Sequence, residues 1–420
     1  MTTSINEKIT SIQQALVSFN LIFVKAEEEE VKTIIAYWIR ILNIRLGWIN
    51  DFDKLVVNYA ATVFMLDTFR SSSMLLQTFS EHTECINSID YLTLDDNQFI
   101  CSASSDRTVR VWDIENNKQF LLFDGHSKTV NCVKFSQYHY HCNNRNVICS
   151  SSYDQTIRFW DINDNQQFQI FNKQTDGVCG IEFSKFNGGK YLCSGSTNKT
   201  VNLLNVETSE LLHVFNGHIS TVWCVDFSPV QSDNNISTVG VIGGNGYTIC
   251  SGSLDQTIRI WDIETTKQLF VFEGHEGWIN GIKYGSNELG ISGGANTILS
   301  GSDDTSVRLW DIRSGKQIQS FNEHTNGVND VAYSPFVIDD DNVSGTSNVI
   351  CSGSMDNTIC FWDIRSNKDT LHMIKGNAKD WGIICLKFLK LKKNKKSNND
   401  RICDINLCYG SLNGVINIWG

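Results

Sequence analysis

The sequence predicts an all-β fold built from seven repeated units of four antiparallel strands each, preceded by a small α-helical segment. Three observations support this prediction. One fourteen-residue motif recurs along the chain, its copies are spaced by 44 to 57 residues, and short runs inside each unit alternate apolar and polar residues. Repeats of this length are typical of architectures in which each unit is one small sheet.

The motif is clearest as SGSLDQTIRIWDIE at residues 251–264, and close copies begin at Ser102, Ser150, Ser300 and Ser352. Each of these five copies contains Trp-Asp near its end, and a weaker copy places Leu204 where the others have tryptophan. The tryptophans that mark the units are Trp112, Trp160, Trp261, Trp310, Trp362 and Trp419. Seven units of this spacing are at or slightly above the usual length of a four-stranded propeller blade.

Within a unit, side chains alternate between two faces. In TIRIWDI, Ile258 and Ile260 point one way while Arg259 and Trp261 point the other, a period of two that is typical of strands. The fourth unit contains four such runs, TVWCVDF, YTICSGS, IRIWDIE and QLFVFEG. The polar segment between the second and third runs, Ser-Leu-Asp-Gln, predicts a tight turn.

These residues closely resemble the WD-repeat β-propeller family, over about 345 of the 420 residues from near Met74 to Gly420. The resemblance implies seven four-stranded blades in a ring around a central channel. One blade alone leaves both faces of its sheet uncovered, and stacking against its neighbours buries them.

The seventh unit has only three strands, because the sequence stops directly after Trp419. The segment MLLQTFSEH, which begins at Met74, matches the outer strands of the other units but has no partner in the first. We therefore expect residues 75–79 to pair with the strand around Val415–Trp419 and to leave no open sheet edge. This places the propeller at residues 74–420 and the helical segment at residues 1–73.

Five of the seven units also repeat a histidine, a serine, an aspartate and a tryptophan. The resemblance implies that these four side chains form a hydrogen-bonded structural brace inside a blade, which satisfies buried polar groups. Five identical braces suit a repeat, whereas five active sites facing five directions do not. The expected braces are His82, Ser102, Asp106 and Trp112; His126, Ser150, Asp154 and Trp160; His218, Ser251, Asp255 and Trp261; His275, Ser300, Asp304 and Trp310; and His324, Ser352, Asp356 and Trp362.

Units three and seven lack this brace, since Gln174 and Asn198 replace its histidine and aspartate in one and Asn377 and Asn413 in the other. We expect these two blades to be the softest. The sequence contains no phosphate-binding Gly-x-x-x-x-Gly-Lys-Ser loop, no His-Glu-x-x-His zinc motif and no Gly-x-Ser-x-Gly elbow. We assign no catalytic residue, no metal site and no cofactor.

The resemblance also implies that partners dock on the end of the ring that carries the outer-to-inner-strand links and the Asp turns, here called the upper face. The positions that map there are Asn131, Tyr153, Trp223, Leu254, Trp278, Asn280, Asp303, Asn329 and Met355. Turn tips are ordinarily polar, so Tyr153, Leu254 and Met355 are unusual. Trp223 and Trp278, in adjacent blades, are either binding anchors or packing residues.

Loops between the first and second strands account for the differences in unit length: 136–146, 229–246, 285–296, 335–348 and 390–400. Their polar composition predicts solvated loops on the opposite face. The lysine-rich stretch 387–396 is either solvated or a docking site for an acidic group.

Charge and composition disfavour some classes of binding partner. The net charge of −11 disfavours nucleic acid, and no apolar run reaches the roughly 18 residues of a membrane span. Six of the fourteen cysteines occupy one equivalent core position, and no Cys-x-x-Cys pair occurs, which suits free thiols in the cytoplasm or the nucleus. The oligomeric state cannot be read from the sequence.

The N-terminal segment shows helical periodicity. Residues 27–46 place Val31, Ile34, Ile35, Trp38 and Leu42 on one face, and a second helix is expected over residues 51–67. These helices either pack on the propeller or dock elsewhere.

The leading hypothesis is a non-catalytic scaffold that binds a protein or peptide on the upper face. One alternative is a substrate-recognition adaptor of a ubiquitin ligase, which no particular residue specifies. The other alternative is an enzyme that uses the channel. A cluster of histidines or carboxylates in the channel, outside the repeated motif, would favour the enzyme; we expect none.

Overall fold

The computed structural model describes residues 69, 73–94, 97–172, 174–229, 247–285, 297–334, 349–364, 370–390 and 405–420. They belong to a compact unit that runs from Met65 to Gly420. The other unit, Met1–Phe64, lies outside the described residues, and so do the two helices expected there. The part of the chain that the structure describes contains no helix with the length and apolar character of a membrane span.

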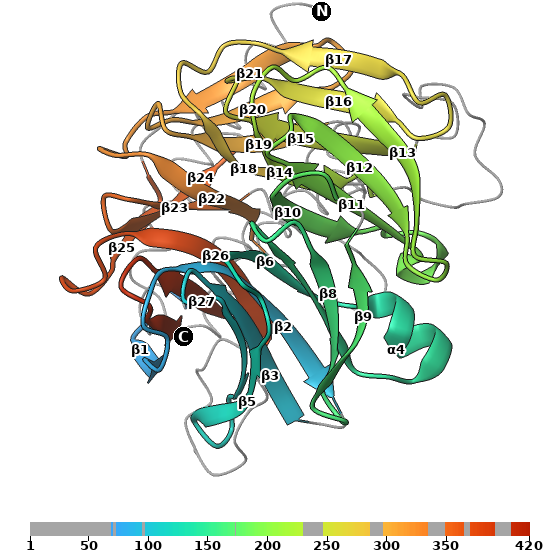
Figure 1. The fold of residues 1–420 in the computed structure, drawn as a ribbon. Coiled ribbons are helices and arrows are strands. Elements are labelled where there is room, and N and C mark those ends of the chain that lie inside the picture. Colours follow the sequence, from blue (N-terminus) through green and yellow to red (C-terminus); the bar gives the residue numbers. More distant parts are fainter. Residues whose placement is uncertain are drawn as a thin grey trace, which may run out of the picture. The chain divides into compact units, whose positions relative to one another are not determined.

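The described strands form seven four-stranded antiparallel sheets, which confirms the predicted β-propeller (Figure 1). Alternation of apolar and polar residues gives each blade its strands. The inner strands are β2 (Ile86–Leu94), β6 (Val130–Phe135), β10 (Val178–Phe183), β14 (Val222–Phe227), β18 (Ile279–Tyr284), β22 (Val328–Tyr333) and β26 (Ile383–Lys390). The second strands are β3 (Asn97–Ser104), β7 (Val147–Ser152), β11 (Tyr191–Ser196), β15 (Thr248–Ser253), β19 (Thr297–Ser302), β23 (Val349–Ser354) and β27 (Ile405–Ser411).

The remaining two strands of each blade lie farther from the axis. The third strands are β4 (Thr108–Asp113), β8 (Ile157–Asp161), β12 (Thr200–Asn205), β16 (Ile258–Asp262), β20 (Val307–Asp311), β24 (Thr358–Asp363) and β28 (Ile416–Trp419). The outer strands are β5 (Lys118–Asp124), β9 (Gln166–Phe171), β13 (Glu210–Asn216), β17 (Gln268–Phe272), β21 (Lys316–Phe321), β25 (His372–Lys375) and β1 (Leu75–Phe79). Blades one to six use consecutive strands, and blade seven combines β26, β27 and β28 with β1.

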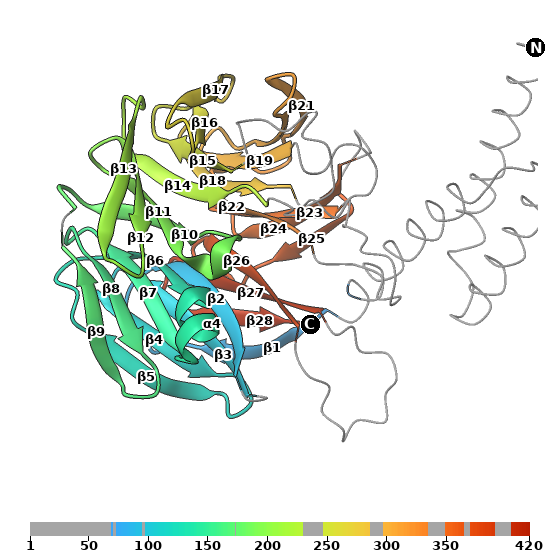
Figure 2. The ribbon, with the colours of Figure 1, turned by 90° about the vertical axis from the view of Figure 1, so that its right-hand side faces the viewer.

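Strand β1 closes the ring. It pairs antiparallel with β28, with Leu75 opposite Trp419 and Phe79 opposite Ile416, so the two strands lie side by side near the C-terminus (Figure 2). Reciprocal backbone bonds between Met74 and Gly420, of 3.1 and 3.2 Å, extend the pairing. The seventh blade thereby gains the fourth strand that its own unit lacks, and β28 is not left as an open edge.

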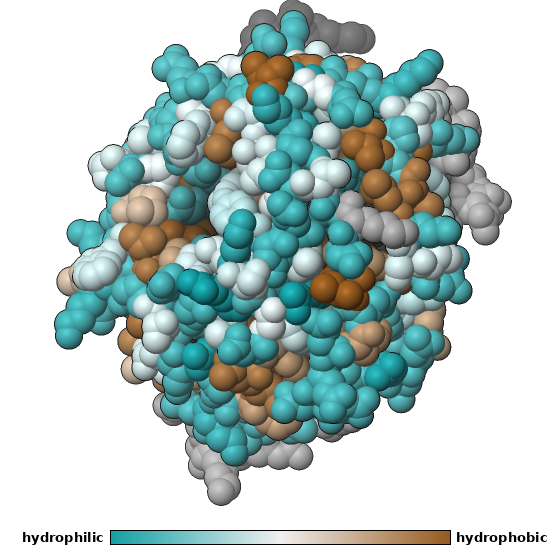
Figure 3. Space-filling view, viewed as in Figure 1, coloured by the Kyte–Doolittle hydropathy of each residue, from teal (hydrophilic) through white to brown (hydrophobic). Residues whose placement is uncertain are grey.

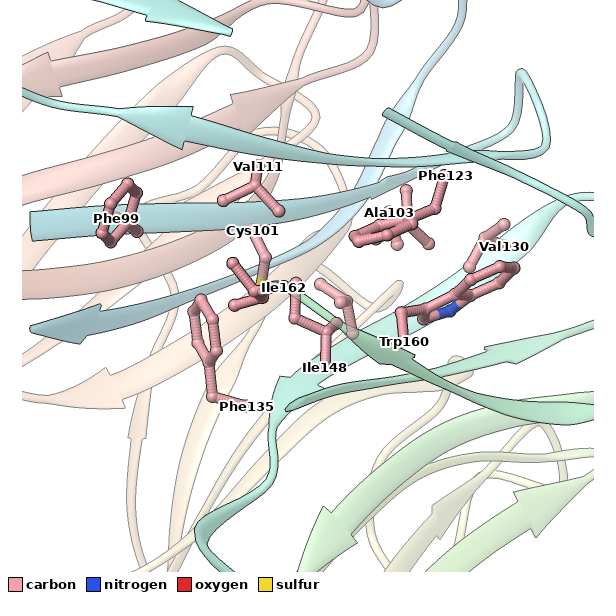
Figure 4. Close-up of a cluster of buried hydrophobic side chains, with 12 residues drawn as sticks. Phe99, Cys101, Ala103, Val111, Phe123, Val130, Phe135, Ile148, Trp160 and Ile162 are labelled. Carbon is pink, nitrogen blue, oxygen red and sulfur yellow. The ribbon is translucent and has the colours of Figure 1, made fainter. Parts of the chain in front are cut away.

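The hydrophobic core is divided among the joints between blades. Figure 4 shows the joint of blades one and two, where Val111 and Phe123 of the first blade face Ile148 and Trp160 of the second. Each blade thus buries its flat faces against its neighbours, which holds the ring rigid.

One of the predicted loops contains a helix. Residues 136–146 were expected to form a solvated loop, but Gln137–Asn143 form helix α4 between β6 and β7. The reason lies in His139, which is buried, accepts or donates a 2.8 Å hydrogen bond with Ser136, and packs edge-on against Phe168 of β9. A short 3-10 turn, Asn187–Gly189, follows β10. The other four predicted loops lie almost wholly outside the described residues.

Candidate functional site

The histidine, serine, aspartate and tryptophan of the motif converge within each of blades one to six except blade three. In blade one, His82 precedes β2, Ser102 lies on β3, Asp106 lies in the turn after it and Trp112 lies on β4. His82 Nδ1 is 2.7 Å from Asp106 Oδ2, and His82 Nε2 is 2.8 Å from Ser102 Oγ. Trp112 Nε1 donates to the same Oγ over 2.8 Å. The His–Asp and His–Ser distances of blades two, four, five and six lie between 2.7 and 2.9 Å.

The protonation states of the brace residues agree with these hydrogen bonds. Burial lowers the pKa of His82 and outweighs the opposing effect of Asp106, so the ring is neutral near pH 7. Burial raises the pKa of Asp106, but hydrogen bonds from His82 and Thr108 lower it by more, and it stays well below its usual range. Neutral His82 therefore donates from Nδ1 to the carboxylate and accepts at Nε2 from Ser102.

The brace serines are not placed to act as nucleophiles. The five brace serines are fully buried, and an indole N–H occupies the serine oxygen in blades one, two, four and five. A serine nucleophile must instead be open to substrate. What the four side chains do is join the upper loop, the second strand and the third strand of one blade.

Blade six departs from this pattern, which the sequence did not indicate. Within the described residues, Trp362 Nε1 is buried and has no hydrogen-bond partner, although His324 still bonds to Ser352 and Asp356. Cys360 stands where the other complete blades have arginine, and its sulfur lies 3.9 Å from His324 Nδ1.

Blade three replaces the brace with an amide network. Asn202 Nδ2 donates to Gln174 Oε1 and Asn198 Nδ2 donates to Thr175 Oγ1, both over 2.7 Å. The equivalent serine, Ser194, is buried, and its hydroxyl has no partner among the described residues. Both neighbours that would bond it, histidine and tryptophan, are absent from this blade.

Blade seven uses a buried aspartate in place of the histidine. Asp380 Oδ2 accepts from the hydroxyl of Tyr409, which stands in the serine position, over 2.8 Å, and from the backbone N–H of Asn377 over 2.8 Å. Asn417 Nδ2 lies 3.5 Å from the same oxygen. Burial raises the pKa of Tyr409, so the phenol stays protonated and donates.

The asparagines assigned to the upper face hold neighbouring blades together. Asn131 Nδ2 donates to the carbonyl of Val178 over 2.7 Å, Asn280 Nδ2 to Val328 over 3.1 Å, and Asn329 Nδ2 to Ile383 over 2.7 Å. Asn87, which was not among the predicted site residues, donates in the same way to the carbonyl of Val130 over 2.9 Å. The register of every inner strand shifts at or next to this position, and such bulges re-aim side chains.

Trp223 and Tyr153 meet, although they come from blades four and two. Their ring centroids are 6.5 Å apart, and each side chain is partly buried. From the sequence, Trp223 had been paired with Trp278, because their blades are adjacent. Leu254 and Met355 are also partly exposed at the tips of their turns.

Trp278 and Asp303 lie together at the top of blade five. The side chain of Trp278 is 52% exposed, and its backbone carbonyl accepts from the N–H of Asp303 over 2.9 Å. The carboxylate of Asp303 is exposed and accepts at Oδ1 from Asn280 Nδ2 over 2.7 Å. These two predicted site residues are thus neighbours, with Asn280 beneath them.

Three further apolar residues reach the upper face and were missed. Ile219 is 74% exposed and Trp381 69% exposed, and Trp381 has a φ of 61°, a left-handed backbone that bulky residues rarely adopt. Leu412 is partly exposed in the turn of blade seven. Leu412 precedes Asn413 as Leu254 precedes Asp255, so the turn-tip rule applied to the seventh unit would have found it. The apolar patches on the face in Figure 3 are small and separated by hydrophilic side chains.

Inside the ring, a cavity of about 530 Å³ is lined by residues from all seven inner strands and is therefore the central channel. The fifth residue of the inner strand is charged in every blade but the sixth, where it is Ala332. These residues are Asp90, Lys134, Glu182, Asp226, Lys283 and Lys387, and Asp330 lies two residues before Ala332. The expectation that the channel lacks a cluster of titratable residues is therefore wrong.

The charges in the channel satisfy one another. Lys134 lies 2.6 Å from Glu182 and Lys387 lies 2.5 Å from Asp90. Burial raises the pKa of Glu182, but Lys134, Lys283 and Lys185 together lower it by more, to about 2. In this mixed ring both charge signs lie in close pairs, except that Asp330 forms no ion pair within the described residues.

Three of these carboxylates also join blades. Asp90 accepts from the N–H of Phe135, Asp226 from Tyr284 and Asp330 from Leu386, each over 2.9 Å and each across a blade joint. Burial raises the pKa of Asp330. In the described segments, no group of three or more His, Cys, Asp or Glu side chains is arranged to hold a metal ion.

Comparison with known proteins agrees with this architecture. The family model described as "WD domain, G-beta repeat" matches residues 73–113, 117–161, 209–262 and 266–311. The model described as "WDR11 second beta-propeller" matches residues 290–413. The repeat model passes over residues 162–208, where blade three has lost its histidine, aspartate and tryptophan.

The curated relatives match short stretches. WD repeat-containing protein pop1 of Schizosaccharomyces pombe is 30% identical over 88 residues, which is 21% of this chain and 11% of that protein. Coatomer subunit beta'-2 of Oryza sativa is 40% identical over 62 residues, 15% of this chain and 7% of that subunit. Human coatomer subunit beta' is 39% identical over 59 residues, 14% of this chain and 6% of that subunit.

The matches thus span 6% to 11% of the length of these relatives. They share stretches of 59 to 88 residues with the chain rather than its whole length. Together with the repeat models and the seven blades, they lead to one conclusion: the chain belongs to the WD-repeat β-propeller family.

Proposed function

We propose that the protein is a non-catalytic scaffold that binds a protein or peptide partner on its upper face. The observation that carries this proposal is the exposure of large apolar side chains at loop and turn tips, above all Trp278, Trp381 and Ile219. Exposed aromatic side chains on a rigid surface are typical anchors of protein interfaces.

The braces support the proposal because they hold the upper face in one conformation. Besides its histidine, each brace aspartate accepts from the backbone N–H of the residue that follows that histidine. Asp255 accepts from Ile219 and Asp304 from Glu276, each over 3.0 Å. Upper loop and turn are therefore fixed to each other, and a surface ordered in advance loses less entropy on binding.

The channel is the observation that bears on the enzyme alternative. Its carboxylates are bonded to lysines and to backbone N–H groups of the next blade, and its thiols point at backbone carbonyls, as Cys224 does at Ile279 over 3.7 Å. We assign these groups to ring closure. General acid–base catalysis would need a group aimed at a substrate position.

The names of the relatives also support a scaffold role. Coatomer subunits are, by name, components of a larger assembly, and we extend only that general role to this chain. The ubiquitin-ligase adaptor stays an alternative that no described residue favours.

The proposal is tested by capturing partners with the full chain and two variants. Trp278→Ala removes an upper-face side chain that is 52% exposed, and Ile318→Ser removes an outer-strand side chain of the same blade that is 53% exposed. Proteins bound by the wild type are quantified by mass spectrometry for each bait. We expect partners to fall about tenfold or more with Trp278→Ala and to persist with Ile318→Ser.

Melting temperatures provide the control for folding, because exposed substitutions usually change stability by no more than about 0.5 kcal/mol. Equal retention of partners by both variants would contradict the proposal. Equal loss with both, at unchanged melting temperature, would move the binding surface to the rim and contradict it as well.

A further inference from the structure

We propose that the upper face recognises a partner segment by a lysine or arginine side chain, held between the indole of Trp278 and the carboxylate of Asp303, with an apolar residue of the same segment on blade four. The inference rests on the proposed function and names the chemistry of the partner. It follows from charge and exposure on two adjacent blades.

The acidic part of this surface lies on blade five. Asp303 bonds through its backbone to Trp278, and Glu276, two residues before Trp278, is exposed on the same loop. Asn280 holds the carboxylate of Asp303 from below through one oxygen, Oδ1. The other oxygen of this exposed carboxylate accepts no hydrogen bond from a described residue, so it can take a donor from outside.

These carboxylates have no cation of their own. The neighbouring acid, Asp304, bonds to His275 over 2.7 Å and to Arg308 over 3.3 Å. In contrast, no lysine, arginine or histidine of the described residues lies within 4.0 Å of the carboxylates of Asp303 or Glu276. A cation from a partner could pair with these carboxylates without displacing a cation of the protein itself.

The ring of Trp278 is equally unoccupied. The one cation–π contact of the described residues is that of Arg145 with Phe168, 5.0 Å from the guanidinium carbon to the ring centroid, on blade two. A cation over an indole face gains attraction from the ring quadrupole. An aromatic ring beside an unpaired carboxylate attracts a cation and repels an acidic segment.

The equivalent positions on blade four are apolar. Ile219 stands where blade five has Glu276, and Leu254 stands where it has Asp303. On each blade, the first of these residues follows the brace histidine and the second precedes the brace aspartate. The two pairs therefore occupy matching places on adjacent blades. The surface therefore changes from apolar to acidic from one blade to the next, which favours a segment with an apolar and a basic residue.

The test uses four pools of fluorescein-labelled nine-residue peptides and the full chain. The central residue is Arg, Lys, Gln or Glu, and the other positions are equal mixtures of Ala, Leu, Phe, Ser and Gly. Fluorescence polarisation measures the affinity of each pool. We expect the Arg and Lys pools to bind about five- to thirtyfold more tightly than the Gln pool, from one cation–π contact and one exposed ion pair.

Asp303→Asn keeps the shape and the bond from Asn280 but removes the charge, and should reduce the preference for the Arg and Lys pools to the about two- to fivefold that the cation–π contact alone provides. Asp176→Asn, at an exposed acid on blade three, changes the net charge equally and should leave the preference intact. A preference that Asp303→Asn leaves undiminished, or tightest binding of the Glu pool, would overturn the inference. If all four pools bind equally and Trp278→Ala abolishes that binding, the inference is overturned but the proposed function stands. If no pool binds, the result counts against both the inference and the proposed function.

Discussion

The indole ring of Trp223 and the phenol ring of Tyr153 lie with their centroids 6.5 Å apart, at an interplanar angle of 52°. Trp223 belongs to blade four and Tyr153 to blade two, so the two side chains meet across the upper end of blade three. Glycines of that blade make the room: a Cβ on Gly177 would lie 2.8 Å from Cδ1 of Tyr153, and one on Gly180 would lie 2.8 Å from the carbonyl oxygen of Trp223.

We expect this pair to couple the two blades energetically. Tyr153→Ala, Trp223→Ala and the double variant form a double-mutant cycle, measured by urea unfolding. Aromatic pairs contribute about 0.5–1.5 kcal/mol beyond burial, and partial exposure places this one near the lower value. Additive effects of the two substitutions would show that the rings do not interact.

Blades five and six offer a matched comparison of the brace tryptophans. Trp310 Nε1 donates to Ser300 over 2.8 Å, whereas the buried N–H of Trp362 has no partner in the described blades. Replacing Trp310 by Phe breaks a hydrogen bond, and replacing Trp362 by Phe removes an unsatisfied donor. We expect Trp310→Phe to destabilise the protein by about 1 kcal/mol more than Trp362→Phe. Equal losses in chemical unfolding would contradict the difference in bonding.

The serines at the brace position of blades two and three offer a similar comparison. Ser150 Oγ bonds both His126 and Trp160 in blade two, while Ser194 Oγ bonds nothing among the described residues. Ser150→Ala should cost about 1–3 kcal/mol, because it leaves buried partners unsatisfied. Ser194→Ala should be neutral or stabilising. A larger loss for Ser194→Ala than for Ser150→Ala would show that the hydroxyl has a partner.

The braces also predict how stability depends on pH. Burial lowers the pKa of His82, His126, His218 and His275 below the ordinary value of 6.5. The unfolded chain therefore binds protons first as the pH falls, so the stability from these groups is complete above pH 6.5 and is lost below it. The brace aspartates, whose pKa is also lowered, add to the loss below about pH 4.

The free energy of unfolding in urea, measured between pH 5 and 8, checks this dependence. The curve should be flat above pH 7 and fall below pH 6.5, with a slope of at most about 1.4 kcal/mol per pH unit for each histidine. His275→Gln, which copies the residue of blade three, should be less stable at pH 7.5 but fall less steeply. An unchanged slope in this variant would rule out a contribution from His275.

Much of the fold could be predicted because the repeated motif fixes strand, turn and strand within each unit. The Asp106 turn and the Trp112 strand follow from local sequence alone, and the missing fourth strand of unit seven identified Leu75–Phe79. Helix α4 could not be predicted, since QYHYHCN has no helical stripe and its order comes from His139 packing on Phe168.

The candidate site was predicted less completely. The hydrogen bond of Asn131 with Val178 could not be predicted, because a bulge aims its amide there and bulges are not visible in a single sequence. The assignment of Asn131 to partner binding stays a prediction. The contact of Tyr153 with Trp223 depends on glycines in the blade between them. The charged channel residues did leave a signal, because aligning the inner strands places Asp90, Lys134 and Glu182 at the same position.

The central claim, that partners bind the upper face of a closed ring, is tested most directly by hydrogen–deuterium exchange of the full chain with and without a captured partner. The account predicts protection confined to the upper loops and turns of blades four to six, around Ile219, Leu254, Trp278, Asp303 and Met355. Protection confined to the outer strands β17, β21 and β25, with unchanged exchange in those loops and turns, would contradict it.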